Sequence, residues 1–192
     1  MGNFRFVQTD IEGLTLVEPR LFTDSRGDFA ETYCKKDFEQ NGITADFVQD
    51  NQSFSRKNVI RGLHFQKKYP QGKLVRVLSG AVYDVAVDLR PGSKTFGKWF
   101  GVELSSRNRL QLYIPEGFAH GFQAFSDGAT FAYKCTRYYE PEDEGGIRWD
   151  DPEIGIVWQL EAGVSPILSE KDSRLPWFKD VKPDIYRLRE DV

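Results

Sequence analysis

The chain has 192 residues, 40% of them hydrophobic, and a formal net charge of −3; this length and composition predict one folded domain and exclude a disordered chain. The mild acidity, without any block of like charge, argues against binding to nucleic acid or to an anionic membrane. Two cysteines and two histidines are too few for a zinc ribbon, a four-cysteine iron–sulfur site, a disulfide framework or a three-histidine metal site.

Apolar residues alternate with a period of two through most of the chain, which predicts short β-strands. The expected strands are, in chain order, 14–17, 29–33, 47–53, 59–66, 73–79, 82–89, 98–104, 110–114, 121–125 and 130–137. A short helix is expected over 35–41, ending at Gly42, and a second after Ser169. Short strands joined by close turns predict an all-β sandwich or barrel.

Past residue 141 the sequence becomes acidic and is punctuated by prolines. The segment 141–146 reads PEDEGG, and the tail 168–192 shows little apolar periodicity. A stretch of about 50 residues of this kind cannot easily build a core of its own. We therefore predict one domain over 1–192, with a loop-rich C-terminal cover from about residue 141.

The N-terminal segment MGNFRFVQTD has neither the basic and apolar regions nor the cleavage site of a secretory signal. No stretch approaches the ~20 apolar residues of a membrane-spanning helix. The expected location is the cytoplasm, without a membrane partner.

The segment RGLHFQ, at 61–66, is expected on a strand, where residues two apart share a face. His64 and Gln66 would then point to the side opposite Leu63. Arg61 and Lys73 are polar neighbours in sequence. A histidine titrates near neutral pH and can carry protons, although a structural histidine at the rim of a barrel fits the same pattern.

The segment IPEGFAHGF, at 114–122, places a proline and two glycines around His120. This predicts a tight bend followed by a close backbone approach, and a β-corner with a structural histidine would satisfy it. The pattern PxGxxHGF also resembles the second motif of cupin-type double-stranded β-helices.

In the segment FAYKCTRYY, at 131–139, a period of two puts Tyr133, Cys135, Arg137 and Tyr139 on one face. On a straight strand Tyr133 and Tyr139 would lie about 20 Å apart and could contact the two ends of an elongated ligand. An aromatic core stripe is the alternative, although such a stripe seldom carries an arginine.

The segment LSEKD, at 168–172, fits a helix capping box with Ser169 at the N-cap and Asp172 three residues later. From these residues alone, capping explains Asp172 better than a catalytic role does.

Together the motifs resemble those of the dTDP-4-dehydrorhamnose 3,5-epimerase family. The segments that carry the resemblance are FTDSRGDFAE at 22–31, FVQDN at 47–51, RGLHFQ at 61–66, GKLVR at 72–76, DVAVD at 84–88, IPEGFAHGF at 114–122, YK at 133–134 and YY at 138–139. Their order and spacing hold from about Ile11 to Asp172, which is most of the chain.

The resemblance implies a cupin-type jelly roll with a few short helices, acting as a homodimer in dTDP-rhamnose biosynthesis. The implied reaction inverts C3 and C5 of dTDP-4-dehydro-6-deoxy-D-glucose to give dTDP-4-dehydro-L-rhamnose. Both carbons flank the C4 ketone, so removing their hydrogens forms an enolate. The reaction therefore needs a base, an acid on the opposite face and a cation at the enolate oxygen.

The resemblance also implies a role for each site residue. His64 would be the base, Tyr133 the acid, Asp172 the carboxylate that orients His64, and Lys73 the cation beside the C4 oxygen. The implied substrate-binding residues are Arg26, Glu31, Gln49, Asn51, Arg61, His120, Tyr139, Glu144 and Lys171. Tyr139 would stack on thymine. The nucleotide diphosphate would be bound by Arg26, Glu31, Gln49 and Asn51, some of them across the dimer interface.

We expect no cofactor and no metal. Metal-binding cupins generally supply a His-x-His pair, and here Gln66 stands two residues after His64. Three alternatives stay open: a related epimerase that inverts only C3 or C5, or a ketoisomerase of the same fold; a non-catalytic nucleotide-sugar-binding cupin; and a metal-dependent cupin oxygenase.

Overall fold

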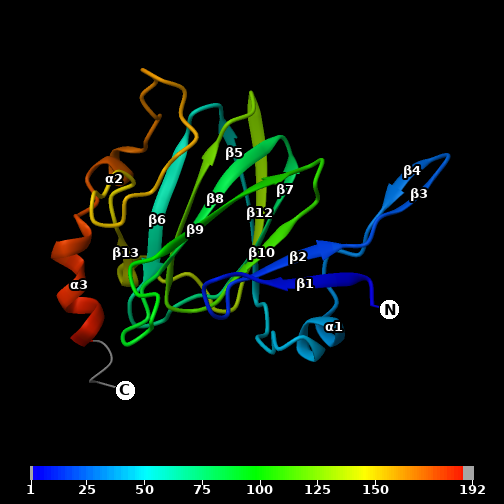
Figure 1. Ribbon diagram of the computed structural model, residues 1–192, viewed down its shortest axis with the longest axis horizontal. Coiled ribbons are helices and arrows are strands. Elements are labelled where there is room, and N and C mark those ends of the chain that lie inside the picture. Colours follow the sequence, from blue (N-terminus) through cyan, green and yellow to red (C-terminus); the bar gives the residue numbers. More distant parts are fainter. Residues whose placement is uncertain (1, 188–192) are drawn as a thin grey trace.

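The computed structural model describes residues 2–187, which form two antiparallel sheets with short helices at the edges (Figure 1). The six-stranded sheet has the order β1 (Phe4–Gln8), β2 (Thr15–Pro19), β10 (Gln111–Ile114), β7 (Lys73–Ser79), β12 (Gly128–Cys135) and β5 (Gln49–Arg56). The five-stranded sheet has the order β13 (Glu144–Gly146), β6 (Ile60–Gln66), β11 (Phe118–Ala124), β8 (Ala81–Asp88) and β9 (Trp99–Ser105). This arrangement confirms the predicted all-β jelly roll.

The main core lies between the two sheets. Val75 and Phe131 of the six-stranded sheet pack in one buried cluster with Val82, Ala86 and Phe122 of the five-stranded sheet. Residues two or four apart, such as Val82 and Ala86 on β8 or Val75 and Val77 on β7, share the face that meets the other sheet, as the period of two requires.

A second buried cluster lies on the other face of the five-stranded sheet. Leu63 and Val85 there pack with Phe178 and Ile185 of α3 (Phe178–Arg187). Strand β11 is therefore covered on both faces and buried along its whole length, His120 and Gln123 included.

The C-terminal cover is more regular than predicted. It holds a 3₁₀ turn (Pro141–Asp143), the expected helix after Ser169, which is α2 (Glu170–Ser173), and the helix α3. The sequence analysis did not predict α3, whose apolar residues pack on the sheet rather than forming a core of their own. Residues 188–192 of the predicted cover lie outside the described residues.

In the N-terminal part of the chain one local prediction is confirmed, one is wrong, and one strand was not predicted. The helix predicted over 35–41 is confirmed as α1 (Lys35–Gln40), and Gly42 after it has a φ of 86°. The strand predicted over 29–33 is instead a hairpin of β3 (Phe22–Asp24) and β4 (Gly27–Phe29), followed by irregular chain. Strand β1 was not predicted and pairs with β2 at the edge of its sheet.

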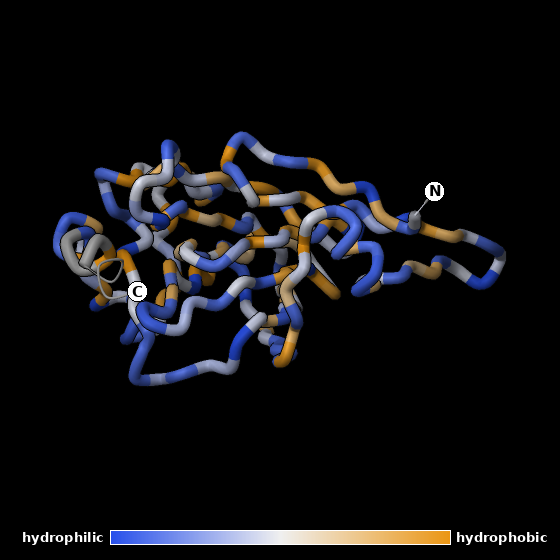
Figure 2. Tube along the Cα trace, turned by 90° about the horizontal axis from the view of Figure 1, so that it is seen from below, coloured by the Kyte–Doolittle hydropathy of each residue, from blue (hydrophilic) through white to orange (hydrophobic). Residues whose placement is uncertain are grey.

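The β3–β4 hairpin extends away from the sheets (Figure 1). Its tip is hydrophilic and its stem carries hydrophobic residues (Figure 2). Phe22 and Phe29 on the stem are 40% and 68% exposed. No helix within residues 2–187 is both long enough and apolar enough to cross a membrane.

Candidate active site

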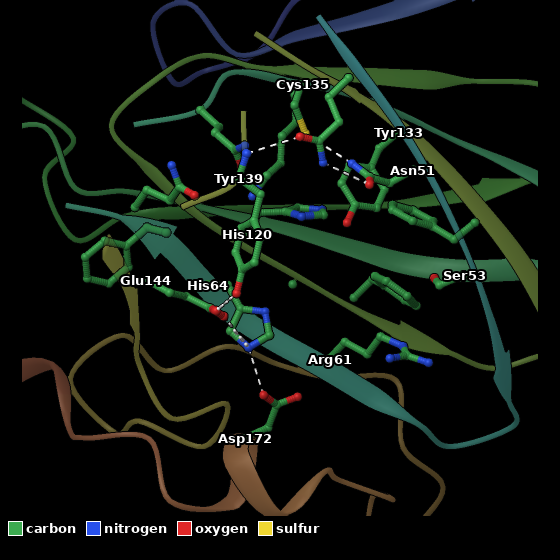
Figure 3. Close-up of a pocket in the computed structure, with 18 of the residues that line it drawn as sticks. Asn51, Ser53, Arg61, His64, His120, Tyr133, Cys135, Tyr139, Glu144 and Asp172 are labelled. Atoms are coloured by element: carbon green, nitrogen blue, oxygen red, sulfur yellow. Dashed lines mark hydrogen bonds and ion pairs between the residues drawn. The ribbon is translucent and has the colours of Figure 1, made fainter. Parts of the chain in front are cut away.

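A cavity of about 390 Å³ opens between the two sheets. It is walled by β6 and β11 of one sheet and by β5, β7 and β12 of the other, and α2 closes one side (Figure 3). The predicted site residues that line it are Gln49, Asn51, Arg61, His64, Lys73, His120, Tyr133, Tyr139, Glu144, Lys171 and Asp172.

Two glycines let β6 and β11 approach each other at the cavity wall. A Cβ on Gly62 would lie 2.6 Å from the His120 carbonyl oxygen, and a Cβ on Gly121 would lie 2.6 Å from the Arg61 carbonyl oxygen. Real side chains do not tolerate such contacts, so glycine is required at both positions. This approach sets His64 and His120 directly opposite each other in the strand register.

The side chain of Asp172 reaches from α2 to the His64 ring. Its Oδ1 lies 2.8 Å from His64 Nε2, and its Oδ2 accepts the Gly62 N–H at 3.4 Å. Ser169 caps the helix by accepting the Asp172 N–H at 3.0 Å. The capping prediction is thus half right, because the Asp172 carboxylate bonds His64 rather than returning to Ser169.

The protonation of this pair follows from its geometry. Burial by itself would raise the pKa of Asp172, but the hydrogen bond and charge of His64 outweigh it and hold the pKa below its ordinary value. An ionised carboxylate only accepts hydrogen bonds, so His64 Nε2 carries the hydrogen. The lone pair of a neutral His64 is then on Nδ1.

Tyr133 stands on β12, in the sheet opposite His64. Burial raises the pKa of its phenol, so the group stays protonated at neutral pH. No residue within the described part of the chain hydrogen-bonds its hydroxyl. Tyr133 therefore presents a protonated phenol on the wall opposite the imidazole.

Lys73 projects from β7 into the same cavity. Burial lowers the pKa of its ammonium, and the charges of Cys135, Asp84 and Glu144 act in the opposite direction. Among residues 2–187, no side chain hydrogen-bonds this ammonium. It is thus a cation of the cavity that is available to a negatively charged ligand.

A connected set of polar groups forms the rim of the cavity. Glu144 accepts hydrogen bonds from the Tyr139 hydroxyl and from the Lys171 ammonium, and its carboxylate lies 4.0 Å from His64. The bond to Glu144 raises the pKa of Tyr139 to about 12. Gln49 accepts the Tyr139 N–H at 3.1 Å, which ties the rim to β5.

Arg61 and Asn51 complete the predicted lining. Arg61 donates to Ser55 Oγ at 3.0 Å and to the Phe54 carbonyl at 3.1 Å. Asn51 donates to Cys135 Sγ at 3.6 Å. Both side chains are held by neighbours and face the cavity (Figure 3).

Two predicted binding residues lie outside this cavity. Arg26 stands at the tip of the β3–β4 hairpin, where it pairs with Asp24 at 2.6 Å. Glu31 accepts a hydrogen bond from Asn3 at 2.9 Å. Within one chain, neither contributes to the cavity lining.

One residue expected on the same face as Tyr133 points elsewhere. Strand β12 ends at Cys135, two residues earlier than predicted, so the alternation does not extend to Arg137. Arg137 pairs with Glu116 at 3.1 Å. Tyr139 nevertheless returns to the cavity through the following loop.

The sequence reasoning assigned no role to Asp84, which supports the cavity from behind. Its Oδ2 lies 2.9 Å from His120 Nε2, and the side chain is fully buried. The sequence signal is a carboxylate inside the apolar strand segment DVAVD. Ser53, Gln71, Phe122 and Phe131 also line the cavity, which only the tertiary structure shows.

The candidate metal ligands of the described residues do not converge in this cavity. The one group of three that lies close enough for a shared ion is Glu31, Cys34 and Asp37, outside it. His64 and His120 are bonded to separate carboxylates.

Comparisons with known proteins agree with this geometry. The model of the family described as dTDP-4-dehydrorhamnose 3,5-epimerase matches residues 8–180. The dTDP-4-dehydrorhamnose 3,5-epimerase of Methanothermobacter thermautotrophicus is 55% identical over 172 residues, covering 90% of this chain and 93% of the relative.

Solved structures match over nearly the whole chain. The dTDP-6-deoxy-D-glucose-3,5-epimerase of Legionella pneumophila, in complex with dTDP-4-keto-L-rhamnose, superimposes with a TM-score of 0.91 at 48% identity, covering 95% of this chain and 96% of that chain. A 3'-monoepimerase from Streptomyces bikiniensis, in complex with dTDP-quinovose, gives 0.85 at 30% identity, covering 95% and 94%. The extent of the family match and the identity to its members establish that this chain belongs to the dTDP-4-dehydrorhamnose 3,5-epimerase family.

Proposed function

We propose that this protein inverts C3 and C5 of dTDP-4-dehydro-6-deoxy-D-glucose to form dTDP-4-dehydro-L-rhamnose, by removing and returning protons through an enolate. The observation that carries the proposal is the composition of the cavity walls. A carboxylate-bound imidazole stands on one wall. A protonated phenol stands on the facing wall, together with an ammonium that has no hydrogen-bond partner among residues 2–187.

The base in this mechanism is His64. Its Nδ1 takes the proton from the carbon beside the ketone, and the C–H electron pair moves to the C4 oxygen to form the enolate. The resulting imidazolium is stabilised by Asp172, which accepts the Nε2–H at 2.8 Å.

The acid is Tyr133. Its hydroxyl gives a proton to the opposite face of the same carbon while the C4 ketone re-forms, which inverts the centre. Each inversion leaves His64 with one proton more and Tyr133 with one fewer. Both groups therefore exchange with solvent before the second carbon reacts.

Lys73 stabilises the enolate. A developing oxyanion is stabilised by a donor close to the position where the charge develops. The Lys73 ammonium lines the cavity and has no hydrogen-bond partner among the described residues. Its lowered pKa also makes it a stronger hydrogen-bond donor than an exposed lysine.

The nucleotide part of the substrate would lie toward the rim. There Tyr139 stacks on thymine, and Gln49, Asn51, Arg61, His120, Glu144 and Lys171 contact the sugar and the diphosphate. The rim position of Tyr139 and the cationic groups of Arg61 and Lys171 support this direction.

The protein acts as a homodimer in this proposal. The β3–β4 hairpin carries Arg26 away from its own cavity (Figure 1), and its stem exposes two aromatic rings. Docking of the stem on a second copy would cover the rings and bring Arg26 and Glu31 to the partner's cavity. Cytoplasmic location likewise stays a prediction.

Inversion of C3 alone is the second candidate, because a 3'-monoepimerase shares this fold. Proton NMR of the substrate with enzyme in deuterium oxide separates the two. The proposed function requires deuterium at both C3 and C5 and the L-rhamno product. Exchange at C3 alone would support the second candidate, and exchange at neither carbon would reject both.

A further inference from the structure

The cavity contains a second histidine–carboxylate pair, beside the first. His120 Nε2 lies 2.9 Å from Asp84 Oδ2, and both side chains are buried. His120 stands opposite His64 in the register of β11 and β6. Each imidazole thus has its own carboxylate, Asp172 from α2 and Asp84 from β8.

Asp84 is an unusual group for the inside of a jelly roll. Its side chain is 0% exposed, and Val82 and Ala86 on the same face of β8 belong to the main core. Its Oδ1 is buried without any hydrogen-bond partner among the described residues. A buried charge in this state is costly unless cations nearby balance it.

The same strand offers a direct contrast in Asp88. This carboxylate is also 0% exposed. Its oxygens accept hydrogen bonds from Arg90, Ser93 and Thr95. The hydrogen bonds of Asp88 come from its own loop, and Asp88 does not line the cavity. The only side chain within residues 2–187 that is bonded to Asp84 is His120, which lines the cavity.

The cation that faces Asp84 from the other sheet is Lys73. No direct ion pair joins them among the described residues, but the charge of Asp84 opposes the loss of the Lys73 proton. The other titratable groups around this ammonium are Cys135 of β12, Glu144 of β13, and His64 and His120 of the facing wall.

We propose that Asp84 is a positioning residue for the epimerase reaction. By accepting the Nε2–H of His120 it holds the imidazole with Nδ1 directed to the substrate. The negative charge of Asp84 also favours the ammonium form of Lys73. This inference rests on the proposed function of the cavity. Asp84 acts through His120 and Lys73 and touches no reacting atom.

The first test is the pH profile of Asp84→Asn, which keeps the size of the side chain and an oxygen acceptor but removes the charge. Removing a nearby negative charge lowers the pKa of an ammonium. We expect kcat to fall at least tenfold near pH 8, with its basic limb moved to lower pH. KM should change less than about threefold.

Asp88→Asn is the matched control, because it removes an equally buried carboxylate from the same strand. It should reduce stability while leaving the pH profile of kcat unchanged. If Asp84→Asn also leaves the profile in place, or both variants move it equally, the proposed role of Asp84 is overturned.

A second measurement does not depend on the variant folding. The chain has only two histidines, so ¹⁵N NMR of histidine-labelled wild-type protein resolves both rings, and a His64→Gln sample assigns them. His120 should carry its hydrogen on Nε2 at neutral pH, with Nδ1 free. A hydrogen on Nδ1 with Nε2 unprotonated would overturn the proposed bond.

The two readouts also separate this inference from the proposed function. Wild-type protein that fails to exchange either carbon of the substrate would reject the function, whatever the tautomer of His120. Active wild-type protein with an unshifted Asp84→Asn profile would reject only the inference.

Discussion

His64 Nε2 and Asp172 Oδ1 lie 2.8 Å apart, although 108 residues separate them in the chain. Asp172 is 3% exposed and stands on a one-turn helix whose N-cap is Ser169. The helix fixes the carboxylate and the carboxylate fixes the ring, so His64 presents Nδ1 to the cavity. The proposed removal of a substrate proton by His64 depends on this contact.

His64→Ala should abolish deuterium incorporation at both C3 and C5, because one base serves both carbons in the proposed mechanism. Loss of a general base costs about 10²–10⁴ in rate. Proton NMR in deuterium oxide measures each carbon separately. Exchange that persists at either carbon would show a second base, and a circular dichroism spectrum matching the wild type would exclude misfolding.

Tyr133→Phe should reduce inversion more than exchange. Without the phenol, His64 still removes the proton and solvent deuterium can return to the same face, but delivery to the opposite face is lost. The ratio of exchanged substrate to inverted product is the quantity to follow by NMR. Tyr113→Phe, on β10 outside the cavity, is the control, and equal losses of exchange and inversion in Tyr133→Phe would contradict its role.

Lys73→Met should lower kcat by about 10²–10³ and change KM much less, because the enolate charge exists only near the transition state. Lys134→Met is the matched control, since Lys134 on β12 pairs with Asp50 at 2.9 Å and does not line the cavity. Steady-state kinetics of the two variants measure kcat and KM separately. A rise in KM with unchanged kcat would mean that Lys73 binds substrate without stabilising the enolate.

Phe29→Asp should weaken self-association, because it places a charge on the exposed hairpin stem. Sedimentation or light scattering across a concentration series should show a dimer for the wild type and more monomer for the variant. Val157→Asp is the control, since Val157 is 65% exposed but lies in the C-terminal cover. A wild-type monomer at all concentrations would rule out the dimer, and activity lost together with the dimer would support the partner role of Arg26.

The pH dependence of stability should include a contribution from Asp88. Burial by itself would raise its pKa, but the hydrogen bonds led by that of Arg90 outweigh it and lower the pKa from 3.8 to about 2. The folded state therefore holds the proton less tightly than the unfolded state, and the stabilisation is complete above about pH 5 and is lost as the pH falls toward 2.

This lowering of the Asp88 pKa corresponds to about 2 kcal/mol in the free energy of unfolding. Urea unfolding of wild type and Asp88→Asn at pH 7 and at pH 3 measures it. The difference between the two proteins should be smaller at pH 3, and a constant difference would assign the effect of Asp88 to packing alone.

Much of the fold could be predicted because alternation is a local property. The two faces of β6 follow from the period of two, with Leu63 in the core behind the sheet and His64 in the cavity. The same reasoning failed for Arg137, because β12 ends at Cys135 and a period of two has no meaning beyond the end of a strand. It missed α3 because that helix is stabilised by the sheet under it.

The candidate site was harder to predict, because its residues come from segments far apart. The residues of LSEKD explain Asp172 as a cap, and only the resemblance to a known family suggested the pairing with His64. No local pattern assigned Asp84 to His120, since the two residues are 36 positions apart in sequence, on strands that are adjacent in space.

The sequence by itself determined the all-β class, the faces of the central strands and the residue types available for proton transfer, because each depends on neighbours along the chain. Tertiary structure decided which carboxylate serves which histidine, that Tyr133 faces His64 from the opposite sheet, and that Arg26 leaves its own cavity. Those relationships depend on the order of strands in two sheets, and strand order is set by the packing of the whole core.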